Sequence, residues 1–386
     1  MDREAWKIAQ QFISYFDEKG FASYIVGGAV RDLLLEREVK DFDVVTKASE
    51  CEIEALFPKA IRASRRFPIY IVRWDDCLFE VTPFRKGAVT LIEDLSKRDF
   101  TMNSLAMDKN GEVIDPLHGL QDLERQRINA HDPEKVFTDD PLRILRAFRF
   151  QSEFGYTIEK KTWKAMIQRL TKLQEVAKER IHAEVGKLLL GEFHKTALTH
   201  FEEAKVASFL PETMKTSSPS TISTTWYLIR LRSENTRWAA FLLRMYGNEA
   251  VAKTSAWRFS NDQKRNVQSI LKTVLTYSEE IPWGQYMIYK MGEAALDAEA
   301  VHQWLHNKEN TNRITDVTHA LSQLPIRSKR DMAVDGRDII NHFDFIKKEK
   351  IGHLLDCAEK AVVHGIVKNE KTALLKYLKE NCEHEK

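Results

Sequence analysis

Cysteine is scarce in this chain of 386 residues, and long apolar runs are absent. Its four cysteines are spaced too far apart for a Cys-x-x-Cys pair or a zinc-ligand pattern: Cys51, Cys77, Cys357 and Cys382. This indicates reduced cytosolic thiols, not a disulfide framework or a zinc site. No stretch approaches the roughly 20 apolar residues of a membrane-spanning helix, and the start, Met1 to Glu4, does not resemble a signal peptide. We expect a cytoplasmic protein without a membrane partner.

The sequence also lacks an excess of either charge. Lys and Arg together number 59 and Asp and Glu 57, a formal net charge of +2. Near neutrality neither requires nor excludes a nucleic-acid partner, because a local basic face matters more than the sum. Hydrophobic residues make up 43% of the chain, enough to form real cores. The length favours about two to four domains.

Helical and strand patterns are unevenly distributed along the chain. An amphipathic helix is predicted from Asp2 to Lys19, and mixed strand and helix patterns run from Phe21 to Asn129. Beyond Pro133 helical periodicity takes over, interrupted by a linker-like stretch at Thr213 to Thr225. The fold class is therefore an α/β head followed by an all-α remainder.

Several elements are specific enough to place. Two strands are predicted at Ile69 to Trp74 and Cys77 to Phe84, and a hairpin at Ala106 to Ile114 turns at Asn110-Gly111. Helices are predicted at Pro141 to Phe154, Glu179 to Leu190 and Asp356 to Leu378.

The most informative pattern is a glycine turn followed by two carboxylates. A β-branched run ends at Gly27-Gly28, and a helical pattern follows from Ala29 to Glu36. A sharp turn into a helix leaves free N–H groups directed at one spot, which suits a phosphate. Asp41 and Asp43 then share a strand face, where a cation between them would relieve their repulsion. Oxygen ligands suit Mg²⁺, so the pattern indicates nucleotidyl transfer.

An Asp-x-Asp pattern alone has a simpler interpretation, two solvated carboxylates on an exposed strand. Arg31, which lies inside the glycine turn, strengthens the interpretation of the pattern as a functional site. Glu80, in the strand pattern Phe79 to Phe84, is either an edge-strand residue or a third carboxylate across the sheet.

A second cluster lies at Lys97 to Asn103. It is either a helix cap with two solvated charges, or a site where Arg98 contacts a triphosphate, since guanidinium groups match phosphate oxygens.

A third cluster runs from Asp139 to Phe150. Its polar members follow one another at steps of three: Asp140, Arg143, Arg146 and Arg149. On a helix they lie along one slowly drifting face, and Pro141 suits the first turn, with Asp139 or Asp140 near the cap. The ordinary interpretation is a charged outer face. Three arginines with one nearby acid fit instead a face directed toward nucleotide and RNA phosphates.

Together these clusters resemble the class II tRNA nucleotidyltransferases, the CCA-adding family that includes bacterial poly(A) polymerases. The matching segments are GGAVRD (Gly27 to Asp32), DFD (Asp41 to Asp43), EVTPFR (Glu80 to Arg85), KRDFTMNSLAMD (Lys97 to Asp108), IDPLHGLQDLERQRI (Ile114 to Ile128), DDPLRILRAFRF (Asp139 to Phe150) and KERIHAEVGKLL (Lys178 to Leu189). Farther along, Ala333 to Ile340 and Ala361 to Leu378 resemble the tail of the Bacillus-type enzymes.

The resemblance implies a polymerase-β-like nucleotidyltransferase head at residues 1–130, then a helical neck at 131–195, a body at 196–310 and a tail at 311–386. It implies that the tRNA acceptor arm is the partner. The implied roles are Mg²⁺ on Asp41 and Asp43 with Glu80 near the metal, the triphosphate on Gly28, Arg31 and Arg98, and the base on Asp140 and Arg143, supported by Arg146 and Arg149. The chain departs from the family pattern at Lys97, Ser104, Asp139 and the stretch Ala63 to Pro68.

Base selection follows from the chemistry of two side chains. Asp140 accepts and Arg143 donates, which matches cytosine or adenine, whereas uracil and guanine place a carbonyl where the carboxylate needs a donor. Three activities fit the resemblance: a full CCA-adding enzyme using CTP and ATP, an A-adding enzyme or poly(A) polymerase, and a non-catalytic RNA-binding module. The intact carboxylates argue against the last.

The sharpest departure from the family is a short connection, where only Arg85 to Ile92 separate Phe84 from Glu93. In CCA-adding relatives a longer, polar, mobile segment acts here as a lever that lets the reading helix change from a C-sized to an A-sized site. A short lever has little slack for this change, although surface loops also tolerate harmless deletions. We therefore expect an enzyme that adds the two cytidines of the terminal CCA from CTP, releases pyrophosphate and leaves the final A to a separate A-adding enzyme.

Overall fold

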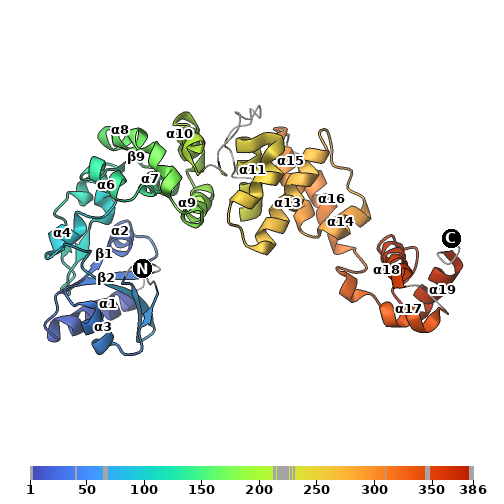
Figure 1. Ribbon diagram of the computed structural model, residues 1–386, viewed down its shortest axis with the longest axis horizontal. Coiled ribbons are helices and arrows are strands. Elements are labelled where there is room, and N and C mark those ends of the chain that lie inside the picture. Colours follow the sequence, from blue (N-terminus) through green and yellow to red (C-terminus); the bar gives the residue numbers. More distant parts are fainter. Residues whose placement is uncertain are drawn as a thin grey trace. The chain divides into compact units, whose positions relative to one another are not determined.

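The computed structural model describes residues 3–39, 41–63, 68–211, 214, 226, 228, 231–308, 310–343 and 348–381 (Figure 1). The chain divides into two compact units, residues 1–215 and 216–386. The predicted linker at Thr213 to Thr225 contains this division and, except for Met214, lies outside the described residues.

A seven-stranded mixed sheet forms the head of the first unit, in the order β3-β4-β5-β2-β1-β6-β7. Strands β2 and β5 pair in parallel, and the other neighbours pair antiparallel. The strands are β1 (Ser23–Val26), β2 (Phe42–Thr46), β3 (Ile61–Arg62), β4 (Tyr70–Trp74), β5 (Cys77–Pro83), β6 (Ala106–Met107) and β7 (Val113–Ile114). The predicted strand pair and hairpin are thus confirmed, with Gly111 in the turn at φ 85°.

Helix α1 (Arg3–Glu18) covers one face of this sheet through its predicted apolar stripe. Phe12 stacks on Phe79 of β5 with ring centroids 4.1 Å apart, and Trp6 meets Phe42 of β2 edge-on at 5.1 Å. Burying each such ring stabilises the fold by roughly 2 kcal/mol. Because Phe42 and Phe79 alternate with the next residues along their strands, those next side chains point to the opposite face, away from α1.

The rest of the first unit is helical apart from a small second sheet. Its helices are α2 (Gly28–Leu34), α3 (Glu50–Leu56), α4 (Leu91–Leu95), α5 (Gly119–Glu124), α6 (Pro133–Asp139), α7 (Arg143–Phe154), α8 (Lys160–Gln168), α9 (Lys178–Leu190) and α10 (His194–Glu203). Strands β8 (Arg127–Ile128) and β9 (Thr157–Ile158) pair in parallel. The sequence did not predict this pair, because two-residue strands carry no readable alternation.

Every regular element that the structure describes in the second unit is a helix, which confirms the predicted fold class. Its helices are α11 (Glu234–Tyr246), α12 (Ala250–Lys253), α13 (Asn261–Thr276), α14 (Gln285–Met291), α15 (Ala294–Leu305), α16 (Thr311–Ser322), α17 (Gly336–His342), α18 (Lys348–Val363) and α19 (Lys371–Asn381). None of the helices described in either unit is long and apolar enough to cross a membrane.

The predicted helical stretch Asp356 to Leu378 is two helices, not one. Gly365 adopts φ 68°, and the N–H of Ile366 donates to the carbonyl of Ala361 at 2.9 Å. A left-handed glycine of this kind ends α18, and the chain starts again at α19.

Candidate nucleotide site

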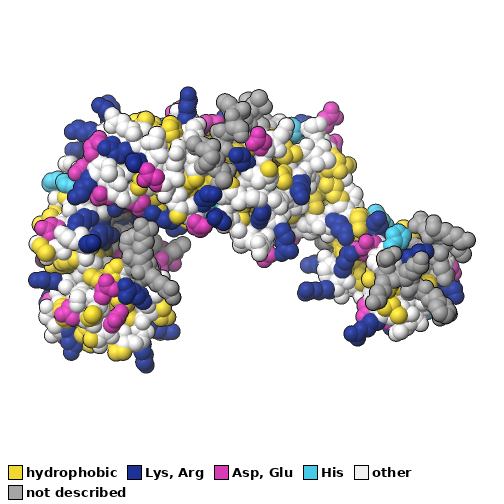
Figure 2. Space-filling view, in the orientation of Figure 1, with side chains coloured by type: hydrophobic (Ala, Val, Ile, Leu, Met, Phe, Trp, Pro, Cys, Tyr) yellow, Lys and Arg dark blue, Asp and Glu magenta, His cyan; other side chains and the backbone are white. Residues whose placement is uncertain are grey.

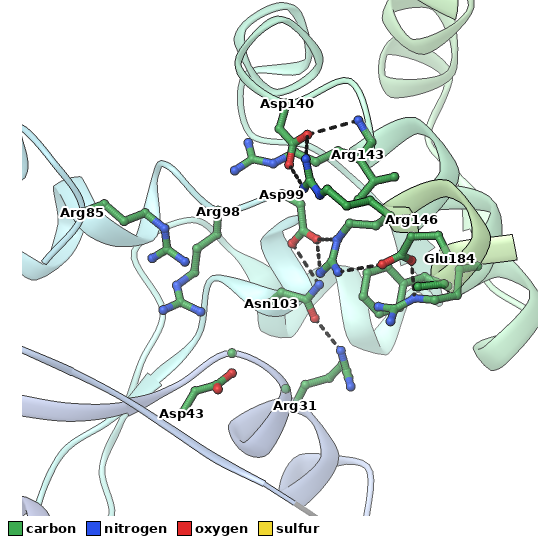
Figure 3. A pocket seen from close by; sticks show the side chains of 17 residues that line it. Arg31, Asp43, Arg85, Arg98, Asp99, Asn103, Asp140, Arg143, Arg146 and Glu184 are labelled. Atoms are coloured by element: carbon green, nitrogen blue, oxygen red, sulfur yellow. Dashed lines mark hydrogen bonds and ion pairs between the residues drawn. The ribbon is translucent and has the colours of Figure 1, made fainter. Parts of the chain in front are cut away.

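A cavity of about 560 Å³ lies in the first unit and is lined by residues of the sheet, α2, α7 and α9 (Figure 3). Its lining contains most of the predicted site residues: Gly28, Arg31, Asp43, Arg98, Asp140, Arg143, Arg146 and Arg149. Asp41 and Glu80 are not part of the lining. Arginines outnumber acids around the cavity, which suits an anionic ligand.

The glycine turn allows a close approach between backbone and guanidinium. Gly27 has φ 72°, and a Cβ placed on it would lie 2.8 Å from Nη1 of Arg98. A side chain at this position would therefore strain the turn and displace Arg98 from the cavity wall.

Of the predicted carboxylates, Asp43 and Glu80 share the sheet face opposite α1, whereas Asp41 stands one residue before the start of β2. Asp43 pairs directly with Glu80 across the parallel strands β2 and β5, and Asp41 lies two residues before Asp43. Burial raises the pKa of Asp43, Arg98 and Arg85 oppose this, and Asp41 raises it further. Partial burial, Asp43 and Asp41 raise the pKa of Glu80. These like charges destabilise one another, and a cation beside them would relieve that repulsion.

The donor set fits a magnesium site completed by other ligands. Among the described residues, no three His, Cys, Asp or Glu side chains lie close enough to hold a metal ion by themselves. Mg²⁺ is commonly held by one or two carboxylates together with water and substrate phosphates. The carboxylate face and the arginine-lined cavity beside it provide this combination.

Two arginines crowd together at one side of the cavity (Figure 3). Arg85 donates to the fully buried Asp94 at 2.7 Å, and Arg98 lies 3.6 Å from the same carboxylate. Burial and the neighbouring Arg85 lower the pKa of Arg98 to about 10, although Asp94 opposes this. One carboxylate between two guanidinium groups leaves surplus positive charge, and Nε of Arg98 has no hydrogen-bond partner.

Helix α7 begins later than predicted. It begins at Arg143, and Asp140 ends α6 in an extended conformation, with φ −147° and ψ 99°. A residue that precedes proline avoids the helical region, so Pro141 excludes Asp140 from a helix. The Asp140 carboxylate instead accepts from the N–H of Leu142 at 3.2 Å. Asp140 therefore stands in the turn between two helices, and only the three arginines lie on α7.

The interpretation that the three arginines have one nearby acid is wrong. Arg146 pairs with Asp99 at 2.6 Å and Arg149 with Glu184 of α9 at 3.3 Å. Burial would raise the pKa of Asp99, but Arg146 and the amide of Asn103 hold it well below its ordinary value. These acids lie far from α7 in the sequence, so helical spacing could not reveal them.

The sequence matches family models along most of its length. They are the poly A polymerase head domain at residues 23–129, the "Probable RNA and SrmB- binding site of polymerase A" at 155–216, and tRNA nucleotidyltransferase domain 2 at 229–378. The chain is 31% identical to the CCA-adding enzyme of Geobacillus sp. strain WCH70 over 97% of both proteins. It is 32% identical to that of Leuconostoc citreum over 98% of this chain and 97% of the relative. The chain belongs to the CCA-adding enzyme family of tRNA nucleotidyltransferases.

The fold of this CCA-adding family member supports the family assignment that its sequence gives. The crystal structure of the Bacillus stearothermophilus CCA-adding enzyme in complex with CTP matches it with a TM-score of 0.86, at 30% identity and over 98% of each chain. Both the resemblance stated from the motifs and the predicted fold class are therefore confirmed.

Several cavity residues of this CCA-adding family member received no individual role from its sequence: Arg85, Asp99, Asn103, Arg180 and Glu184. Arg31 donates to Asn103 at 2.5 Å, Asn103 donates to Asp99 at 3.0 Å, and Asp99 holds α7 through Arg146. A chain of polar contacts thus joins the glycine turn to α7. The only available signal was that each of these residues lies inside a family motif.

The departures from the family pattern have modest structural consequences. Lys97 donates to the carbonyl of Lys86 at 2.8 Å, and its own carbonyl accepts from Arg143 at 2.7 Å. The Ser104 hydroxyl donates to the carbonyl of Phe100, and Asp139 is exposed at the end of α6. The fourth departure, at Ala63 to Pro68, falls mainly on residues 64–67, outside the described residues.

Proposed function

We propose that this chain adds cytidine nucleotides to the 3′ end of tRNA from CTP and stops after two additions. The observation that carries the reaction is one cavity with two kinds of chemistry. Asp43 stands at one end of it, and the acceptor and donor pair Asp140 and Arg143 at the other, with arginines between (Figure 3). This arrangement suits a nucleoside triphosphate bound with its phosphates at the sheet and its base at α7.

In the proposed reaction the 3′-hydroxyl oxygen of the RNA attacks the α-phosphorus of CTP and a new ester bond forms, while the hydroxyl proton passes to solvent. Pyrophosphate leaves with the electrons of the broken P–O bond. Asp41 and Asp43 would hold Mg²⁺ with Glu80 nearby, and the metal supplies Lewis-acid stabilisation of the phosphoryl oxygens. Arg98 and Arg85 stabilise the charge on the leaving pyrophosphate from the cavity wall. Gly28 and Arg31 complete the phosphate end.

The tRNA acceptor arm is the proposed polymer substrate. Asp140 accepts from the exocyclic amine of cytosine, and Arg143 donates to the ring nitrogen or carbonyl beside it. Arg146 and Arg149 support the pair by anchoring α7 to Asp99 and Glu184. The four-part division into head, neck, body and tail belongs to the same proposal.

The names of the relatives favour a second candidate, complete CCA addition from CTP and ATP. The feature that favours addition of two cytidines only is the connection before α4, which is short and held at several points. The Arg85 N–H donates to Asp94 at 2.8 Å, the Ala88 N–H to the Arg85 carbonyl at 2.8 Å, and the Val89 N–H to Glu93 at 2.7 Å. Such a segment has little freedom to move a neighbouring helix.

The connection is also linked to α7. The Lys97 side chain donates to the connection at Lys86, and the Lys97 carbonyl accepts from Arg143, so Lys97 couples the connection to a change of the base-reading site. Switching from cytosine to the larger adenine requires such a change, and this supports arrest after two cytidines.

The deciding experiment separates the two candidates. A tRNA transcript without its CCA end is incubated with CTP, and a transcript already ending in CC with ATP alone. We expect two cytidines on the first transcript and no efficient addition to the second. Efficient addition of one A would establish the complete CCA-adding activity, and no incorporation of either nucleotide would contradict both candidates.

A further inference from the structure

We propose that Arg180 is a positioning residue that sets the orientation of the Asp140 carboxylate and thereby the selectivity for cytosine over uracil. This inference rests on the proposed base-reading role of Asp140. Arg180 lies in the first turn of α9, in a family motif whose side chains the reaction described above leaves without a chemical role, and its guanidinium lines the same cavity.

The two side chains form a forked pair. Nη1 of Arg180 lies 3.2 Å from Oδ1 of Asp140, and Nη2 lies 2.7 Å from Oδ2. Two parallel hydrogen bonds fix the plane of a carboxylate, which a single bond cannot do. The Leu142 N–H also donates to Oδ1, so both a side chain and the backbone hold the carboxylate.

Counting acceptor positions shows what remains for a base. A carboxylate has about four lone-pair positions, and Arg180 with the Leu142 N–H occupies two on Oδ1 and one on Oδ2. The remaining position on Oδ2 can accept one N–H. Cytosine offers an amine N–H there, whereas uracil offers an oxygen, which the fixed lone pair repels.

The pair also restrains Arg180 itself. With both terminal nitrogens committed to Asp140, the guanidinium is not directed at a ligand. If it were released it could donate to a uracil carbonyl and weaken the discrimination. The fork therefore keeps a strong donor away from the position that must reject a carbonyl.

The pair contributes little to folding. The Arg180 side chain is 49% exposed and that of Asp140 29% exposed, and ion pairs this exposed contribute little stability. Helix α9 is held in the unit by buried apolar residues instead, including Ile181, Val185 and Leu188. A change at Arg180 can therefore alter selectivity while the fold persists.

The test measures kcat and KM for single-nucleotide addition with CTP and with UTP in the full-length protein. We expect Arg180→Met to raise KM for CTP and to lower the CTP to UTP ratio of kcat/KM about tenfold, the effect of losing one charge-assisted hydrogen bond. Arg180→Lys keeps the charge without the fork and should give an intermediate ratio. Arg169→Met is the matched control, because Arg169 pairs with Glu134 away from the cavity lining.

Asp140→Ala, measured beside these variants, separates the two levels of the proposal. Relaxed selection in Asp140→Ala with an unchanged ratio in Arg180→Met would overturn the inference and leave base reading by Asp140 intact. Unchanged selection in Asp140→Ala would remove both. A lower unfolding temperature of Arg180→Met, with equal losses for both nucleotides, would assign Arg180 a merely structural role and also overturn the inference.

Discussion

The charged side chains around the cavity form two regions, one in which acids are paired with arginines and one in which carboxylates lie close to one another. Around Asp99 and Glu184 the acids are matched by arginines, so that α7 is held in place. Around Asp43 like charges remain close to one another, and burial with these neighbours raises the pKa of Asp43 and Glu80. Matched charges stabilise the structure, whereas in the second region Arg98 and Arg85 only partly offset burial and the repulsion between carboxylates, which favours binding a cation.

The first prediction concerns the region around Asp43. Asp41→Ala or Asp43→Ala should lower the rate of cytidine addition by at least about a thousandfold, since metal-assisted charge stabilisation supplies several kcal/mol. The free energy of unfolding should not fall, because burial disfavours the charge of Asp43 and because Asp41 and Asp43 repel each other. Addition assays and urea unfolding measure the two effects. Asp76→Ala, in the exposed turn between β4 and β5, is the control, and near-normal turnover in either Asp41 or Asp43 variant would refute the metal assignment.

At the scale of elements, some helices bury titratable side chains, and α15 is an example. His302 is buried on α15, and His306 follows the last residue of that helix, with the two ring centroids 4.4 Å apart. His302 Nε2 lies 3.1 Å from the carbonyl of Tyr277. Burial, and then the charge of His306, lowers the pKa of His302, while burial and Lys308 lower that of His306. Both rings are therefore favoured in the neutral form.

This has a consequence for stability at low pH. Below the ordinary histidine pKa of 6.5 the unfolded chain binds more protons than the folded one, so the free energy of unfolding should fall as the pH drops from 7.5 toward 5.5. His302→Gln cannot take up the proton and should show a shallower fall. Urea unfolding of both proteins at several pH values gives the comparison. Parallel curves for the two proteins would show that His302 does not contribute.

At the scale of the whole molecule, the near-neutral net charge conceals local charge. Lys and Arg side chains are interspersed with acids over the face shown in Figure 2, and the arginine-rich cavity lies in the first unit. Binding of tRNA through phosphates would therefore depend on local basic groups, and not on a long-range field of the entire protein.

The corresponding prediction is a steep dependence of tRNA affinity on salt. Each phosphate contact releases counterions, so the affinity should fall at least about tenfold between 50 and 200 mM salt. Filter binding or fluorescence anisotropy with a tRNA transcript measures it, and an unrelated transcript with the same acceptor stem should bind nearly as well. An affinity that does not change with salt would contradict recognition through the phosphates.

Local signals were strong enough to predict much of the head and several helices from sequence. The stripe of α1, the glycine turn and the hairpin at Gly111 each rest on spacing or on one permissive residue. The residues that define each of these features are close together in the sequence. The motifs also identified the correct family, and most residues that line the cavity lie within them. Pro141 excludes Asp140 from a helix and also suits the first turn of one, so these two preferences of proline place the start of α7 differently.

The tertiary structure alone decided which charges meet. Asp99, Asp140 and Glu184 approach their arginine partners from segments separated by up to 47 positions in the sequence. Helical periodicity reports only neighbours three or four residues apart, so it made the arginines of α7 look unpaired. The sequence by itself determined the elements, the family and the chemistry at hand. The packing of α9 and the loop after α4 against α7 decided which of these side chains are held in place and which face the cavity, because such contacts depend on distance in space.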